Sequence, residues 1–104
     1  MYDYIKMEGK HILITGGASG IGRQTAITLS ELGARVAILD LQDEGLKETL
    51  SMLKGNGHSI HPVDLSKTEE LEPLIVAIVK ETGPFDGYVQ CAGIVKSLPL
   101  INYK

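Results

Sequence analysis

Apolar residues form four short runs along the chain, and the stretches between these runs carry apolar residues at helical spacing. The runs lie at residues 11–15, 35–40, 59–64 and 86–92. Each is apolar on successive positions, as expected for parallel strands that are covered on both faces. The pattern therefore predicts the element order βαβαβαβ, with no linker, repeat or low-complexity segment.

The first two predicted helices end in glycine. The first begins near Ile21 and ends at Gly33, where a left-handed residue is typical of a helix C-terminus. The second ends before Gly55. Their expected buried faces are Ile21, Thr25, Ala26, Leu29 and Leu32 in the first, and Leu46, Leu50 and Leu53 in the second.

The third predicted helix opens with a capping-box pattern at residues 66–69 and stops at Gly83 and Pro84. Pro73 lies inside it. Because proline lacks the backbone N–H and costs about 3 kcal/mol in a helix interior, the sequence predicts a kink or a late start there.

Strands that alternate with helices across short connections imply right-handed crossovers and a parallel sheet. We expect a Rossmann-type doubly wound α/β fold with strand order 3-2-1-4, truncated after the fourth strand. The chain reverses direction between the first and fourth strands, and ligands in such sheets bind at that switch point. Candidate chemistry should therefore gather at the carboxyl ends of the strands.

Composition narrows the class of protein. The 104 residues, 43% hydrophobic and 22% charged, fit a single globular domain over residues 1–104. Apolar runs are too short for a membrane span and the N-terminus lacks a signal-peptide pattern, so we expect a cytoplasmic protein. A net charge of −3 argues against nucleic-acid binding. Cys91 is the only cysteine, and the histidines show no metal-ligand spacing, so we expect a packing role for Cys91 and no metal site.

A glycine-rich turn at residues 15–22 follows the first predicted strand and leads directly into a helix. Glycines allow backbone angles that other residues avoid, and unpaired N–H groups at a helix N-terminus attract anionic oxygen. The spacing G-x-x-x-G-x-G differs from that of a P-loop. This pattern favours a phosphate-binding turn, with a simple tight turn as the alternative.

The run Thr-Gly-x-x-x-Gly-Ile-Gly at this position resembles the cofactor fingerprint of the short-chain dehydrogenases/reductases. Further matches end the other predicted strands, at Asp40, at residues 64–66 and at residues 91–93. The resemblance extends from about Glu8 to Ile94. It implies an NAD(P)-dependent oxidoreductase that acts on an alcohol or ketone.

The resemblance also implies site residues. Glycines would shape the turn, the main chain of the next residues would face the cofactor diphosphate, Asp64 would bind the adenine amino group beside Leu65, and the backbone of Ala92 and Gly93 would approach a ribose. The complete set of cofactor-binding residues is Gly16, Ser19, Gly20, Ile21, Gly22, Asp40, Asp64, Leu65, Ala92 and Gly93. Asp64 could instead simply end its strand.

Asp40 indicates the choice of cofactor. A carboxylate at this strand end can accept hydrogen bonds from the adenosine ribose, whereas the 2′-phosphate of NADP would be repelled by about 4 kcal/mol at ~4 Å and a dielectric of ~20. Ser19 and Leu41, where the family often carries a basic NADP contact, are neutral. We therefore expect NAD to be preferred over NADP. The alternative is a solvated strand-end charge.

Two departures from the family pattern affect function. Cys91 replaces the usual Asn, which removes an amide that is expected to steady the sheet. The family's Ser and its Tyr-x-x-x-Lys after the fourth strand are missing, since only Tyr103 and Lys104 lie near the end, and Tyr2 and Lys6 precede the first strand. We therefore expect no catalytic residue and no activity from this chain alone.

The fourth strand would form an uncovered edge with Val89 partly exposed. The chain is then either part of a longer enzyme or associates with a second copy through that edge. The alternative to an oxidoreductase is a noncatalytic dinucleotide-binding or regulatory module.

Overall fold

The computed structural model describes residues 7–91 and places the secondary structure in the predicted order. The elements are β1 (His11–Thr15), α1 (Gly20–Glu31), β2 (Arg35–Asp40), α2 (Asp43–Met52), β3 (Ser59–Pro62), α3 (Thr68–Thr82) and β4 (Gly87–Gln90). The prediction for β1 and β2 is confirmed to the residue, while β3 and β4 are shorter than predicted.

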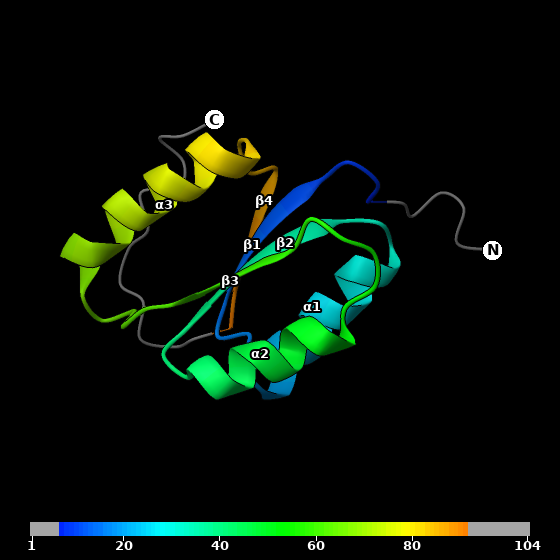
Figure 1. Ribbon diagram of the computed structural model, residues 1–104, viewed down its shortest axis with the longest axis horizontal. Coiled ribbons are helices and arrows are strands. Elements are labelled where there is room, and N and C mark those ends of the chain that lie inside the picture. The colour runs from blue at the N-terminus through cyan, green and yellow to red at the C-terminus, as the bar shows by residue number, and fades with distance from the viewer. Residues whose placement is uncertain (1–6, 92–104) are drawn as a thin grey trace.

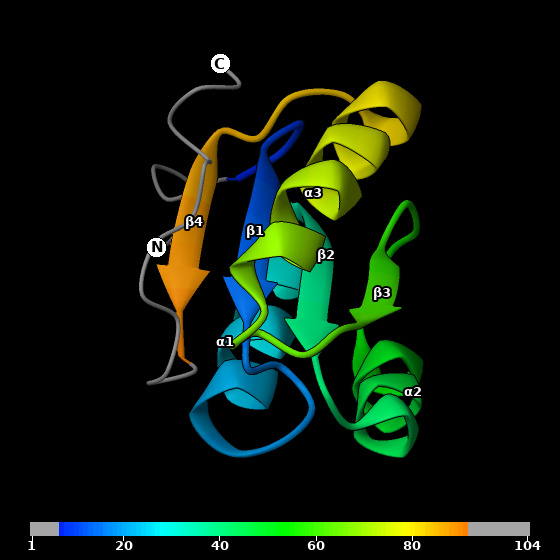
Figure 2. The ribbon, with the colours of Figure 1, turned by 90° about the vertical axis from the view of Figure 1, so that its left-hand side faces the viewer.

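The strands form one parallel sheet in the order β3-β2-β1-β4, which confirms the predicted topology (Figure 2). Ile14 of β1 lies beside Ile38 of β2 on one side and Val89 of β4 on the other. Helices α1 and α2 cover one face of the sheet and α3 covers the other, so the fold has three layers (Figure 1). This is the Rossmann-type arrangement that the alternation of elements predicts.

Side chains of successive strand residues enter two separate cores. In β1, Ile12 and Ile14 face α1 and α2, whereas Leu13 between them faces α3. All three are at most 5% exposed. A strand covered on both faces must be apolar at every position, which explains the continuous apolar runs in the sequence.

The buried face of α1 agrees with the predicted one at Ala26 and differs from it elsewhere. Gly22, Ala26 and Ser30, which follow one another at i, i+4 and i+8, are its buried residues. Ile21 is 80% exposed, so its assignment to the core was wrong. Small residues allow the helix backbone to lie close to the sheet, and this leaves Ile21, in the first turn, outside the contact. Gly33 follows the helix with φ +99, as expected for its end.

In α2 the buried face, and in α3 the N-terminal cap, also differ from the predictions. Leu50 of α2 is 37% exposed, and Thr49 beside it is fully buried. The N-cap of α3 is Lys67 without a side-chain cap, so the predicted capping box is wrong. The hydroxyl of Ser66, which lies before this N-cap, donates to Asp64 Oδ1 instead, at 2.7 Å.

Pro73 lies well inside α3, which starts at Thr68, so the alternative of a late start at the proline is wrong. The side chain of Pro73 is exposed, on the side of the helix away from the core. Leu71, Ile75 and Ile78 carry the buried face and fix the helix against the sheet. Packing of this face offsets the unfavourable proline.

β3 ends at Pro62, two residues before Asp64, and the chain then turns. The Lys67 N–H donates to Asp64 O at 3.0 Å and closes that turn. β4 pairs only with β1 among the described strands, and Val89 is half-buried, in agreement with the expected edge position. The predicted end of the fourth strand at Ala92 lies outside the described residues.

Candidate functional site

The carboxyl ends of the strands meet around the glycine-rich turn. The Gly16 N–H donates to Leu39 O of β2 at 2.8 Å, and the Cys91 N–H donates to Thr15 O of β1 at 2.9 Å. These two bonds place the turn between the ends of β2 and β4. It therefore stands at the switch point where the chain reverses direction, as the sequence predicts.

Glycine is required in the turn for two different reasons. Gly16 and Gly20 have φ of +81 and +60, in the left-handed region that disfavours other residues. Gly22 has an ordinary φ, but a Cβ there would lie 1.9 Å from Gly16 O. The first turn of α1 is therefore packed directly on the backbone of the strand end.

The N-terminus of α1 is left open. Its N-cap, Ser19, has an extended backbone and makes no side-chain cap hydrogen bond, and the first turn of the helix contains no acidic residue. By contrast, the first turns of α2 and α3 each contain two acidic residues. Carboxylates near a helix N-terminus satisfy its positive end. Among the helices described, α1 is therefore the one whose positive end is not offset by an acidic residue in its own first turn.

The carboxylate of Asp40 lies against this turn. Its Oδ2 accepts a hydrogen bond from the Ala18 N–H at 3.0 Å, and its Oδ1 accepts one from the Gln42 N–H at 3.1 Å. Asp40 is thus more than a solvated strand-end charge, because it joins β2 to the turn. Each oxygen keeps a second lone pair, and the residue is partly exposed.

Asp64 and Leu65 lie in the loop between β3 and α3. Asp64 Oδ1 accepts hydrogen bonds from the hydroxyl and the N–H of Ser66, and these bonds hold the pKa of the Asp64 carboxyl below its ordinary value. Leu65 is 5% exposed and packs in the core beneath α3. Contact between the Leu65 side chain and an adenine ring remains a prediction, and little of that side chain is available for it.

Some residues at this site were not found from the sequence. Arg23 and Thr49 bind the carbonyl groups of the turn from the side of α2, and Ala18 receives the Asp40 carboxylate. The sequence did not indicate Arg23 as a site residue because an arginine in an amphipathic helix ordinarily points to solvent. Its partners lie on another helix, which no local pattern reveals.

The end of β4 completes the described part of the site. Cys91 follows β4, is half-buried and is the last described residue, and the predicted contacts at Ala92 and Gly93 lie outside the described residues. Within residues 7–91 no group of three or more His, Cys, Asp or Glu residues could hold a metal ion. Across the same range, no helix is both long and apolar enough to cross a bilayer.

Comparison with known proteins identifies the family. The family model described as short chain dehydrogenase matches residues 10–104. The chain is 36% identical over 92 residues to 2,3-dihydro-2,3-dihydroxybenzoate dehydrogenase of Bacillus subtilis (strain 168), an alignment that covers 86% of this chain and 35% of that protein. With the parallel sheet and glycine-rich turn in place, the chain belongs to the short-chain dehydrogenase family of oxidoreductases.

Solved structures share the fold. NAD⁺-bound xylitol dehydrogenase superimposes with a TM-score of 0.77 at 29% identity, over 80% of this chain and 33% of that one. The F189W actinorhodin polyketide ketoreductase with NADPH gives 0.74 at 36% identity, over 81% and 33%. The chain spans about a third of the length of these relatives. The family binds a nicotinamide dinucleotide, and the two structures hold different forms of it.

Proposed function

We propose that this chain binds NAD(H), in preference to NADP(H), at the glycine-rich turn and the carboxylate of Asp40. The observation that carries the proposal is the contact between the Asp40 carboxylate and the Ala18 N–H, which sets an acidic group beside an open helix N-terminus. The helix N-terminus suits a diphosphate, and the carboxylate suits the two hydroxyl groups of a sugar.

The diphosphate would lie at the start of α1. The main-chain N–H groups of Ser19 and Ile21 belong to the first residues of the helix, which have no intrahelical acceptor. The positive end of the helix attracts the two negative charges of the diphosphate. Gly16, Gly20 and Gly22 would shape this surface without side chains that block the approach.

The adenosine ribose would lie at Asp40. Its two hydroxyl groups are donors, and the carboxylate retains acceptor capacity beyond the two backbone bonds that fix it. A 2′-phosphate in the same place would be repelled by about 4 kcal/mol at ~4 Å and a dielectric of ~20, before screening by salt. The neighbouring Leu41 is 66% exposed and carries no charge to compensate.

The remaining contacts follow the family pattern. Asp64 would accept a hydrogen bond from the adenine amino group through the carboxylate oxygen that Ser66 does not occupy. Leu65 would lie beside the adenine, and the backbone of Ala92 and Gly93 would approach a ribose. Together these residues would form one dinucleotide-binding domain over residues 1–104.

The reaction would be hydride transfer between NAD(H) and an alcohol or ketone. The xylitol dehydrogenase and polyketide ketoreductase among the structural relatives support this substrate class by their names. Because the sequence holds no Tyr-x-x-x-Lys after β4, the 104 residues alone would bind cofactor without turnover. A noncatalytic binding module would also bind cofactor without turnover, so turnover must be measured on any longer natural form of the protein.

We also propose that the protein is located in the cytoplasm.

The test compares dissociation constants for NADH and NADPH in the parent and in Asp40→Asn. Asparagine keeps a carbonyl oxygen for the Ala18 N–H but removes the charge, so it separates the electrostatic role from the structural one. We expect the preference for NADH over NADPH to fall at least tenfold. Tenfold corresponds to about 1.4 kcal/mol, which is about a third of the unscreened repulsion. Asp43→Asn, which removes the same charge from an exposed neighbour, is the control. An unchanged ratio in Asp40→Asn would refute the assignment.

A further inference from the structure

The geometry points to Arg23 and Thr49 as positioning residues for the Ser19 N–H, which the proposed function assigns to the diphosphate. Neither residue would touch the cofactor. Arg23 binds the carbonyl group of the peptide unit that carries the Ser19 N–H, and so sets the direction in which this N–H points. Thr49 binds the carbonyl group of the preceding unit and holds the Arg23 side chain. This inference rests on the proposed function, because it assigns these two residues a role in the same site.

Thr49 and Asp40 hold the peptide unit between Gly17 and Ala18 at both ends. The Thr49 hydroxyl donates to Gly17 O at 2.7 Å, and the Ala18 N–H donates to Asp40 Oδ2 at 3.0 Å. A trans peptide is planar, with its C=O and N–H groups directed oppositely. The two bonds therefore fix the plane of this unit. Thr49 is fully buried, so its hydroxyl is shielded from water.

Arg23 holds the next peptide unit by its carbonyl alone. Its Nη2 donates to Ala18 O, and no described residue accepts a hydrogen bond from the N–H of Ser19, which lies at the other end of that unit. Because C=O and N–H point in opposite directions, the Arg23 contact turns the Ser19 N–H away from α2. Ser19 is exposed, so this N–H group is left for a ligand.

The two side chains act as one unit. Arg23 Nε donates to Thr49 Oγ1 at 2.9 Å, which leaves the threonine hydroxyl hydrogen for Gly17 O. Arg23 Nη2 also reaches Gly45 O of α2 at 3.2 Å. The planar guanidinium group is needed to reach acceptors on the turn and on α2 at once, and an ammonium group is not equivalent.

Close packing of α2 supports the same role. A Cβ at Gly45 would lie 2.7 Å from Ala18 O, so this helix is pressed against the turn at the carbonyl that Arg23 binds. The Arg23 side chain is 22% exposed, and Nη2, the nitrogen that binds Ala18 O, also forms the ion pair with Glu48 of α2 at 3.1 Å. The same guanidinium nitrogen therefore joins the turn to α2.

The experiment measures the affinities of the full chain for NADH and for adenosine, which lacks the diphosphate. Thr49→Val removes the hydroxyl at nearly constant shape, and Thr49→Ser restores it. Arg23→Lys keeps the charge but loses the planar fork. Gln24→Ala, an exposed neighbour on α1, is the control. Melting temperatures of the same samples show how far each variant is destabilised.

We expect Thr49→Val and Arg23→Lys to weaken NADH binding about fivefold or more, the effect of one lost hydrogen bond of about 1 kcal/mol. Adenosine binding should change less than twofold, and Thr49→Ser should restore NADH affinity. A general structural defect would weaken both ligands alike, and this result would overturn the inference. Unchanged NADH affinity in Arg23→Lys, which does not depend on the folding of Thr49→Val, would overturn it as well. A parent chain that binds neither ligand would overturn the proposed function too.

Discussion

Replacement of Gly22 by alanine tests whether close contact between α1 and the strand end shapes the site. The new Cβ would lie 1.9 Å from Gly16 O and 2.6 Å from the Gly16 carbonyl carbon, both of which are backbone atoms. To restore even a 3.0 Å contact, the helix start and the turn must separate by about 1.1 Å. Unlike a side chain, the backbone cannot relieve this overlap by rotation.

The expected cost of Gly22→Ala is about 1–3 kcal/mol of unfolding free energy for overpacking, reduced by up to about 1 kcal/mol because alanine favours a helix. The effect on ligand binding should be larger. Hydrogen bonds to a diphosphate need donor–acceptor distances of about 2.7–3.2 Å, and a separation of about 1 Å would break them. We expect NADH affinity to fall more than tenfold.

Gly83→Ala is the matched control for this variant. Gly83 ends α3, and its φ of +98 makes alanine unfavourable there by about 1–2 kcal/mol, although no atom lies within 4 Å of the new Cβ. It should therefore lose stability without losing NADH affinity. Urea unfolding and fluorescence titration on both proteins provide the comparison. If Gly22→Ala keeps both the stability and the NADH affinity of the parent, the reasoning from the close contact is refuted.

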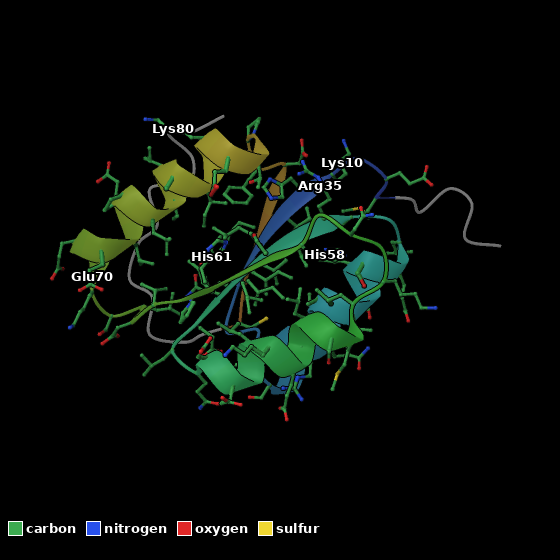
Figure 3. All side chains as sticks on the ribbon, in the orientation of Figure 1. Lys10, Arg35, His58, His61, Glu70 and Lys80 are labelled. Atoms are coloured by element: carbon green, nitrogen blue, oxygen red, sulfur yellow. The ribbon has the colours of Figure 1, made fainter. Side chains whose placement is uncertain are left out.

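Two further predictions concern stability. Burial holds the imidazole pKa values of His11 and of His61, which is labelled in Figure 3, below the ordinary 6.5. At lower pH the unfolded chain therefore takes up protons that the folded chain does not, so the unfolding free energy should be constant above about pH 7 and fall as the pH decreases below 6.5. Equal unfolding free energies in urea at pH 5 and pH 8 would contradict this. Ile75→Ala should cost about 2–5 kcal/mol because the side chain is fully buried beneath α3. The exposed Ile21→Ala should cost less than about 0.5 kcal/mol, and equal losses in the two variants would contradict the assigned core.

The environment of His11 shows why acid should act on the fold. Its ring stacks on Phe85 with centroids 4.4 Å apart, and Nδ1 lies 3.3 Å from Gly83 O. Nε2 is buried without a hydrogen-bond partner among the described residues. A proton there would add a poorly solvated charge, and Arg35 opposes it further, while Asp86 acts in the opposite direction. Protonation of His11 is therefore linked to unfolding.

The sheet could be predicted from sequence because its cause is local. A strand buried on both faces needs apolar residues in succession, and residues 12–14 and 36–39, inside the first two strands, show this without interruption. Parallel crossovers then restrict the strand order to few choices. The ends of β3 and β4 were less accurate. The turn that Lys67 N–H and Asp64 O close ends β3 at Pro62, earlier than the predicted run to residue 64.

Packing between distant elements explains most of what the sequence did not reveal. The periodicity of α1 correctly included Ala26 but also favoured Ile21 as a core residue, whereas close approach to the sheet buried Gly22 and Ser30. Apolar patterns do not show how closely two backbones approach. In the same way, Arg23 and Thr49 are 26 residues apart, and their shared role at the turn appears only in three dimensions.

The most direct test of the central claim is an amide ¹H–¹⁵N spectrum of the chain recorded with increasing NADH. If the diphosphate binds at the start of α1, the resonances of Ser19, Gly20 and Ile21 should shift most and saturate together, while those of Glu69 and Glu70 at the start of α3 should stay in place. Saturable NADH binding that leaves the α1 amides unshifted, or that moves the α3 amides instead, would contradict the account.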